Sequence, residues 1–365
     1  MSGNRILVCP MDWGLGHASR DVELIHHLLQ AGFEVILGAD AAPLLFLREH
    51  FPKLEYLVIP SYKISYSNKG SMVLKMLFSV PKIIWGIWKE HQLLKEIIRK
   101  KRIDLVISDN RFGLWNKKVQ SVFISHQLWI KSPKSFRCAE PIINRINHWF
   151  INKYDECWVP DFENAPFLAG DLAHPVKKPS NVKYMGPLSR FKLPLSAVKE
   201  DLISAEKFDI LVTLSGPEPQ RSLLEQQIVT QVLMERFKTL IIRGKPGEFE
   251  QFEQENIRFI NHLNSFQMRK LIIETPVIIC RSGYSSVMDL VTLQKSAILI
   301  PTPGQTEQEY LAEYLKGKMW FYSVTQKDFE LEKAMLVLEK FKINCKFENN
   351  SLLKECINSL NPEPL

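Results

Sequence analysis

Several features that would assign a chain to a special class are missing from these 365 residues. No run reaches the roughly 18 uninterrupted apolar residues of a membrane-spanning helix, and no apolar leader follows Met1, so we expect neither a span nor a signal peptide. The six cysteines form no C-x-x-C pair, which favours reduced thiols in a cytoplasmic protein. No Asp-x-Asp motif occurs, so a divalent-metal site is not indicated.

The composition is that of a globular protein, with 45% hydrophobic and 24% charged residues. A chain of this length is expected to form two domains, each large enough to bury its own core. No internal repeat or low-complexity segment is visible, which argues against a repeat architecture.

The net charge of +7 is unevenly distributed. Residues 63–102 contain ten Lys and Arg against two Glu, and residues 72–88 interleave this charge with large apolar side chains. Nucleic acid, anionic lipid or an anionic acceptor could bind such a segment. We expect peripheral contact with an anionic membrane rather than nucleic acid, because the segment is too short and too charged to span but rich in aromatic residues. A buried helix pair with a solvated basic face is the alternative.

Apolar runs alternate with helical periodicity along the whole chain, which predicts parallel sheets built from β-α units. The strands are expected at residues 6–9, 34–37, 56–59, 105–108, 122–125, 157–159, 184–185, 210–214, 240–242, 258–260, 277–280 and 297–300. A helix is predicted from about Arg20 to Ala31, with Gly32 as its cap. We expect domains at residues 1–190 and 208–345, a linker at 191–207 and a C-terminal helix within 346–365.

Residues 279–310 contain two successive strand–turn–helix units. The first turn is Arg281-Ser282-Gly283 and the second is Pro301-Thr302-Pro303-Gly304. Backbone N–H groups at the start of a helix can hold an anion. Carboxylates and amides just inside the helices suit sugar hydroxyls, which need both donors and acceptors. The segment therefore predicts a pocket for a nucleotide sugar.

The first strand runs into a glycine-rich turn that ends in a histidine and an arginine. Gly14 and Gly16 permit a tight turn and a close approach to a ligand, and His17 and Arg20 follow. His17 would face the carboxyl end of the sheet, where an imidazole can take a proton from a hydroxyl or a water. Asp109, at the end of another strand, could orient His17 or an acceptor hydroxyl. The alternatives are that His17 caps a structural turn and that Asp109 caps another.

These motifs resemble those of GT-B glycosyltransferases, and most nearly those of glycosyltransferase family 28, which includes the N-acetylglucosaminyltransferase of peptidoglycan-precursor synthesis. The turn at residues 14–20 is also similar to that of a nucleotide-sugar hydrolase from bacterial sialic-acid-like sugar synthesis, whose cleft histidine is catalytic. The resemblance implies an α/β GT-B fold with two Rossmann-like, doubly wound parallel-sheet domains facing a central cleft. It also implies that the C-terminal helix packs back on the first domain.

The resemblance assigns donor-binding positions residue by residue. The family's turn at 281–283 faces the nucleotide diphosphate, its ribose-binding acid corresponds to Asp289, and its sugar-gripping Gln-Gln pair corresponds to Gln308 and Glu309. Asp289 stands where the family more often has Glu, and Glu309 stands where the family has Gln. Pro217 and Pro219 also depart from the family's glycine-rich turn, because they remove backbone donors. The resemblance also implies that Arg190 reaches the phosphates and that the backbone of Ile260 reads the uracil edge. The other implied donor-binding residues are Ser215, Gly216, Ser282, Gly283, Ser285, Asp289, Glu307, Gln308 and Glu309.

We therefore expect an enzyme that transfers a hexosyl or N-acetylhexosaminyl group from a nucleotide-diphosphate sugar, expected to be a UDP-sugar, to an acceptor hydroxyl without metal or cofactor. His17 and Asp109 would be catalytic, and Gly14, Gly16 and Arg20 would form the acceptor-side loop. A lipid-linked acceptor would place the protein on the cytoplasmic face of the membrane. A nucleotide-sugar hydrolase that uses water and a non-catalytic nucleotide-sugar-binding protein are the two alternatives.

Overall fold

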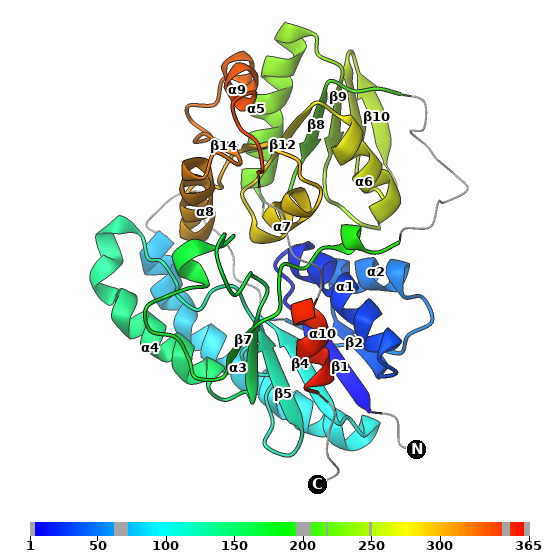
Figure 1. The fold of residues 1–365 in the computed structure, drawn as a ribbon, viewed down its shortest axis with the longest axis vertical. Helices are drawn as coiled ribbons and strands as arrows, with labels where there is room; N and C mark the ends of the chain where they lie inside the picture. Colours follow the sequence, from blue (N-terminus) through cyan, green and yellow to red (C-terminus); the bar gives the residue numbers. More distant parts are fainter. Residues whose placement is uncertain are drawn as a thin grey trace. The chain divides into compact units, whose positions relative to one another are not determined.

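The computed structural model describes residues 4–61, 72–194, 206–216, 218–247, 250–344 and 351–360. The chain folds into two compact units (Figure 1). The first contains residues 1–13, 17–188 and 348–365, and the second contains residues 189–347 together with Gly14–Gly16. The division falls just before the predicted linker, of which residues 195–205 lie outside the described part of the chain.

The first unit is built on a sheet with the strand order β3-β2-β1-β4-β5-β6-β7, in which the described neighbours pair in parallel. The order reverses between β1 and β4, and ligands of such open sheets bind at the carboxyl ends of the strands beside that reversal. The elements are β1 (Arg5–Pro10), α1 (Gly16–Gln30), β2 (Glu34–Ala39), α2 (Ala41–His50), β3 (Tyr56–Val58), α3 (Met72–Lys101), β4 (Leu105–Asp109), β5 (Gln120–Ile124), η1 (Lys134–Ala139), α4 (Glu140–Ile151), β6 (Glu156–Val159), η2 (Gly170–Leu172), β7 (Val182–Tyr184) and α10 (Ser351–Asn358).

The second unit repeats this plan with the strand order β10-β11-β9-β8-β12-β13-β14, which reverses between β8 and β12. Its core strands are buried apolar runs, as expected for a parallel sheet covered on both faces. The elements are η3 (Arg190–Lys192), β8 (Ile210–Thr213), α5 (Gln220–Glu235), β9 (Thr239–Ile242), β10 (Gln251–Gln254), β11 (Ile257–Ile260), α6 (Ser265–Glu274), β12 (Val277–Cys280), α7 (Tyr284–Thr292), β13 (Ile298–Leu299), α8 (Thr306–Gly317), β14 (Tyr322–Ser323) and α9 (Leu331–Leu338).

The predicted α/β architecture with two parallel-dominated sheets is confirmed, and the differences from the expectation are local. Helix α1 begins at Gly16 rather than near Arg20, because the small residues before Arg20 continue the helix without contributing to its apolar pattern. Strand β10 was not predicted, because its four residues are all exposed. It pairs antiparallel to β11 at the edge of the sheet, so this sheet is not purely parallel.

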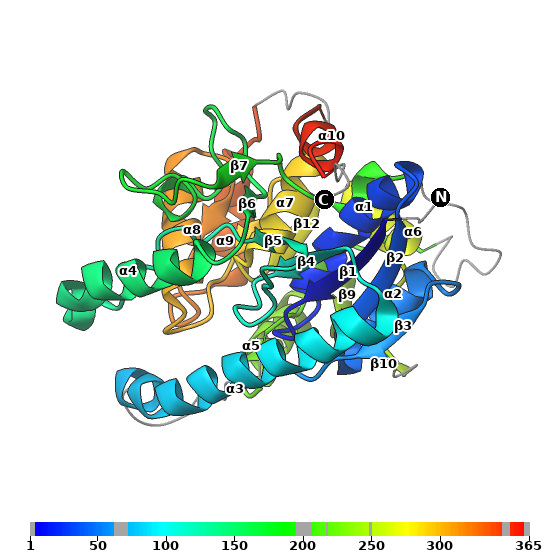
Figure 2. The ribbon, with the colours of Figure 1, turned by 90° about the horizontal axis from the view of Figure 1, so that it is seen from below.

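The described part of the basic, apolar segment is one long helix, α3, and not a pair (Figure 2). Residues 63–71 of that segment lie outside the described residues. The C-terminal half of α3 packs on the sheet through Leu94 and Ile97, which are buried against Leu7 and Val106. Over the part of the chain that the structure describes, no helix combines the length and apolar character needed to cross a bilayer.

Helix α10 groups with the first unit, although it follows the second in sequence (red in Figure 1). Lys183 Nζ donates to the hydroxyl of Ser359, just after this helix, at 3.1 Å. Leu353, Cys356 and Ile357 form its buried face. The last strand of the first sheet is therefore covered by the end of the chain.

Candidate active site

His17 and Asp109 lie together in the first unit, at the carboxyl ends of the two central strands. Strands β1 and β4 pair in register as far as Pro10 and Asp109, and α1 begins shortly after β1 ends. His17 Nδ1 lies 3.0 Å from Asp109 Oδ1, although the two residues are 92 positions apart in sequence. The structure thus brings the two predicted catalytic residues into direct contact.

Arg20, predicted to belong to the acceptor-side loop, binds the same carboxylate. Its Nε donates to Asp109 Oδ2 at 2.8 Å, and its second terminal nitrogen donates to Oδ1. Burial raises the pKa of Asp109, but the positive charges of Arg20 and His17 and their hydrogen bonds outweigh burial and hold this pKa well below its usual range. Asp109 is therefore ionised at neutral pH.

The ionised carboxylate selects one tautomer of His17. Because a carboxylate only accepts hydrogen bonds, the nitrogen that faces it, Nδ1, carries the proton, and Nε2 keeps its lone pair. Arg20 lies 3.0 Å from the same Nδ1, since both groups donate to Asp109 Oδ1. The His17 side chain is mostly buried but 14% exposed. A histidine held in this way can act as a general base, and the carboxylate stabilises the imidazolium that forms.

Asp21 is a further carboxyl beside this group that the sequence did not lead us to expect. It is fully buried, and burial together with the negative charge of Asp109 raises its pKa well above the usual range. A neutral Asp21 avoids the repulsion between two buried carboxylates. In the sequence, Arg20, Asp21 and Glu23 look like a solvated charged stretch, although all three are buried.

The turn that follows Asp109 is fixed from several sides through Arg111. This fully buried arginine donates to Glu90 of α3 at 2.9 Å and to the carbonyls of Ile59 and Pro60 beyond β3. Its own carbonyl accepts the hydroxyl of Tyr154 at 2.6 Å. Asp109 is consequently held at the end of a strand whose continuation has little freedom to move.

In the second unit, the turn predicted to face the diphosphate, residues 281–283, presents backbone N–H groups to a ligand rather than side chains. Gly283 precedes α7, which has no side-chain cap and no acidic residue in its first turn, where Ser285 lies. The hydroxyl of Ser282 is buried and donates to the carbonyl of Gln308 at 2.8 Å. An anion at this turn would therefore meet the N–H groups of the first turn of α7.

Arg281 does not reach into the turn, because its guanidinium is buried and bound to oxygen atoms of the fold. It donates to the carbonyl of Gln220 at 2.7 Å, to the side-chain oxygen of Gln326 at 2.9 Å and to the carbonyls of Ile300 and Pro301. Burial lowers its pKa to about 10, so it remains charged at neutral pH. A positive charge thus lies beneath the turns that follow β12 and β13.

Asp289, the predicted ribose acid, is held by the segment that enters the second unit. Ser189 donates its hydroxyl to Asp289 Oδ1 at 2.5 Å and accepts the backbone N–H of Phe191 at 3.2 Å. Burial raises the pKa of Asp289 to about 6, although the charge of Arg190 and the hydrogen bond from Ser189 lower it. The structure therefore brings Asp289 and Arg190, two of the predicted donor residues, into one electrostatic group.

The predicted sugar-binding side chains on α8 stabilise the loop that precedes this helix. Gln308 Oε1 accepts the N–H of Thr302 at 2.9 Å, and Gln308 Nε2 donates to the side chain of Gln305 at 2.5 Å. Glu309 Oε1 accepts the N–H of Gly304 at 2.9 Å, and Glu307 lies in the same first turn. Gln308 is buried and Glu309 is exposed, so the two differ in their access to a ligand.

The remaining donor positions lie at the ends of β8 and β11. Gly216 has a φ of +95°, which only glycine adopts easily, and follows Ser215 at the end of the first strand. Ile260 is buried in β11, and its carbonyl accepts the N–H of Arg243 at 2.9 Å. The Ile260 carbonyl is therefore engaged in the sheet, and the backbone of the next residue, Asn261, is bonded to Glu250 and Lys245.

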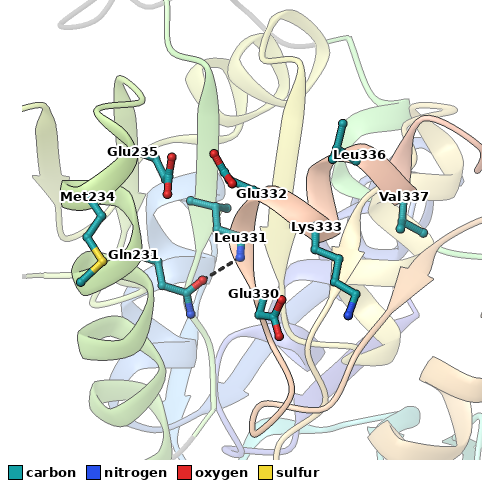
Figure 3. Close-up of a pocket in the computed structure, with 9 residues that line it drawn as sticks. All are labelled: Gln231, Met234, Glu235, Glu330, Leu331, Glu332, Lys333, Leu336 and Val337. Carbon is teal, nitrogen blue, oxygen red and sulfur yellow. Dashed lines mark hydrogen bonds between the residues drawn. The ribbon is translucent and has the colours of Figure 1, made fainter.

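A surface groove in the second unit lies apart from these residues (Figure 3). It runs between the C-terminal end of α5 and the start of α9, where Gln231 accepts the N–H of Leu331 at 2.6 Å. The C-terminal end of α5 is the end remote from Ser215 and Gly216. The groove contains none of the predicted donor residues and is not the candidate site.

The chain is similar in sequence to known glycosyltransferases. Residues 217–354 match the glycosyltransferase family 28 C-terminal domain. An uncharacterized glycosyltransferase of Methanosarcina acetivorans is 23% identical over 338 residues, which cover 87% of this chain and 86% of that protein. The UDP-N-acetylglucosamine–N-acetylmuramyl-(pentapeptide) pyrophosphoryl-undecaprenol N-acetylglucosamine transferase of Caldanaerobacter subterraneus is 21% identical over 181 residues, 44% of this chain and 50% of that enzyme.

Solved structures match the chain over nearly its whole length. The glycosyltransferase of kitacinnamycin has a TM-score of 0.63 at 13% identity and covers 98% of this chain and 94% of its own. MurG of Acinetobacter baumannii has a TM-score of 0.51 at 13% identity with the same coverage. At these identities the likeness shows the fold, which is GT-B with two Rossmann-like domains, as predicted.

The raised pKa of Asp289 gives a prediction on pH. If this carboxylate accepts a ribose hydroxyl, it does so only when ionised, so affinity for UDP should increase as the pH rises from about 5 to about 7, through the pKa of about 6. Calorimetry should show this increase in the native protein. In Asp289→Asn the only remaining pH dependence should be that of the nucleotide's own phosphate. Identical pH profiles for the two proteins would contradict a role of Asp289 in binding.

Proposed function

We propose that this chain, a glycosyltransferase of the GT-B fold with a family 28 C-terminal domain at residues 217–354, transfers a sugar from UDP to the hydroxyl of a lipid-linked acceptor. The observation that most supports catalysis is the contact between the buried, ionised Asp109 and Nδ1 of His17. A protein that only binds nucleotide sugars does not need an imidazole oriented with a free lone pair. The names of the relatives support a UDP-N-acetylhexosamine as the donor.

The chemistry assigned to the first unit is proton transfer. His17 Nε2 takes the proton from the acceptor hydroxyl as its oxygen forms a bond to the anomeric carbon of the donor sugar. The bond between that carbon and the diphosphate oxygen breaks, and the diphosphate leaves with the electron pair. Asp109 stabilises the resulting imidazolium without itself taking a proton.

The second unit would stabilise the departing diphosphate without a metal ion. The guanidinium of Arg190 and the N–H groups at the start of α7 supply positive charge and donors for phosphate oxygens. Asp289 would hold the ribose, and Glu307, Gln308 and Glu309 stand on the helix nearest the expected sugar. The presence of Glu309 in place of the family's glutamine predicts a sugar preference of its own.

The proposal of a lipid-linked acceptor rests on the exposed side chains of α3 and α4. Large apolar side chains on both helices are more than half exposed: Ile84, Trp85 and Trp88 on α3, and Ile142, Ile146 and Trp149 on α4. Lysines accompany them, since Lys89 Nζ lies 3.6 Å from the Trp85 ring and Lys153 Nζ lies 4.2 Å from the Trp149 ring. Aromatic and basic side chains together suit the interface of an anionic membrane.

A side chain of α3 and one just after α4 both lie near Trp115. The ring of His91 on α3 lies 4.3 Å from the Trp115 ring, and Lys153, just after α4, lies 5.6 Å from it. We name the six exposed residues Ile84, Trp85, Trp88, Ile142, Ile146 and Trp149 the apolar face. This face supports a transferase with a membrane-borne acceptor over a nucleotide-sugar hydrolase, which needs only water. We propose that the protein acts at the cytoplasmic side of the membrane.

Loss of the base should slow chemistry while leaving donor binding intact. We expect His17→Ala to lower kcat by about 10²-fold or more with little change in nucleotide affinity, the usual scale for removing a general base. His26→Ala, on the same helix, is the matched control and should keep kcat. Near-native turnover of His17→Ala would show that His17 only caps the helix.

Docking on lipid is tested by sedimentation with vesicles that contain anionic phospholipid. The native protein should sediment at low salt and be released at high salt, and Lys82→Glu with Lys89→Glu should weaken binding by about 1 kcal/mol or more per substitution. Trp85→Ser with Trp88→Ser should weaken it at any salt concentration.

The matched control replaces Met234 and Leu336 by Ser, because these two side chains are at least as exposed but lie in the second unit. This control should sediment like the native protein. Failure of the native protein to bind vesicles at any salt concentration would contradict a membrane-borne acceptor.

A further inference from the structure

The hydroxyl of Thr302 is buried without a hydrogen-bond partner among the described residues. Thr302 is 2% exposed and stands in the turn after β13, where its backbone N–H donates to Gln308 Oε1 at 2.9 Å. Its Oγ1 accepts and donates no hydrogen bond within the described part of the chain. Since an unsatisfied buried polar group is costly, such hydroxyls in folded proteins usually have a partner from outside the chain.

The location of this hydroxyl indicates where such a partner would lie. A Cβ atom at Gly216 would stand 3.9 Å from Thr302 Oγ1, so the hydroxyl lies beside the turn that follows β8. Strand β12 pairs with both β8 and β13, and the uncapped start of α7 follows it. The turns after β8, β12 and β13 therefore lie side by side at the carboxyl edge of the sheet, and this hydroxyl lies beside the first of them.

The charges around these turns favour an anion at α7. The buried guanidinium of Arg281 donates to the carbonyl of Pro301, the residue directly before Thr302. At α5, by contrast, the carboxylate of Glu218 already accepts the N–H and the hydroxyl of Ser222. At α8, Glu309 accepts the N–H of Gly304. Carboxylates of the chain therefore bind groups at two of the three helix starts, whereas α7 has neither a side-chain cap nor an acid in its first turn.

We infer that Thr302 is a ligand-binding residue whose hydroxyl donates to a phosphate oxygen of the nucleotide diphosphate, beside the first turn of α7. The inference rests on the proposed function, since that function supplies the diphosphate. It adds a side-chain contact from the turn after β13 to the backbone donors at the start of α7. The turn after β8 contributes Gly216, whose lack of a side chain keeps the approach to Thr302 open.

The test removes the hydroxyl and retains the shape of the side chain. Calorimetry is performed with whichever of UDP, GDP and dTDP the native protein binds and with the matching nucleoside. Thr302→Val should weaken binding of the diphosphate roughly 10- to 100-fold, as expected for a hydrogen bond to a charged group, and leave nucleoside binding unchanged. Thr302→Ser, which keeps the hydroxyl, should bind nearly as the native protein does.

Thermal unfolding distinguishes this role from a structural one. Without nucleotide, Thr302→Val should unfold at the native temperature or above, because it removes an unpaired buried hydroxyl. Thr239→Val is the matched control: its buried hydroxyl donates to the carbonyl of Phe237 at 3.0 Å, so this variant should lose stability and keep nucleotide affinity. If Thr302→Val fails to fold, Thr302→Ala serves in the same measurements.

Two outcomes would overturn the inference while the proposed function stands. Native diphosphate affinity in Thr302→Val would show that the partner of the hydroxyl is a water molecule, and a loss confined to the sugar nucleotide would show that it is the sugar. If the native protein bound none of the three nucleotides, the proposed function would fall, and this inference with it.

Discussion

The buried carboxylate of Asp109 is the interaction on which the first unit's chemistry depends. Burial alone would raise the pKa of a carboxyl in this position, because burial favours the neutral form. Arg20 and His17 reverse that preference, and the ionised carboxylate in turn determines which nitrogen of His17 carries the proton. The strand order then matters, because it places the ends of β1 and β4 side by side and so allows residues 92 positions apart to meet.

In the second unit the buried charge is positive: it belongs to the guanidinium of Arg281, and backbone N–H groups stand at the start of α7. Arg281 has no exposed surface and is bound to carbonyl and amide oxygens, so its charge is not cancelled by these partners. The resulting positive field, together with the uncapped start of α7, suits a diphosphate. A carboxyl with a raised pKa, Asp289, lies close to Arg190 in the same unit, so donor binding and protonation are expected to be linked.

The sequence predicted the fold and the strand ends at which candidate residues stand. It did not predict the hydrogen-bond partners of individual side chains. Apolar runs and glycine-rich turns mark strand ends, so the sequence indicated that His17, Asp109 and the turn before α7 follow or end strands, and the structure places them there. Hydrogen-bond partners depend on tertiary packing, which no local pattern encodes. Gln308 and Glu309 thus stabilise their own loop, Arg281 is bound within the fold, and no local pattern indicated that Asp21 and Thr302 are buried. The exposed strand β10 was missed because it has no apolar run.

The central claim is that this chain moves a sugar from a nucleotide diphosphate to a membrane-borne hydroxyl. The most direct test incubates the native protein with UDP-, GDP- and dTDP-sugars labelled in the sugar, with and without a membrane lipid extract, and measures both free nucleotide and labelled lipid. The account predicts nucleotide release from a UDP-sugar that depends on the extract and is matched by label in the lipid fraction. Release at the same rate without extract, with the label appearing as free sugar, would contradict it and identify a hydrolase.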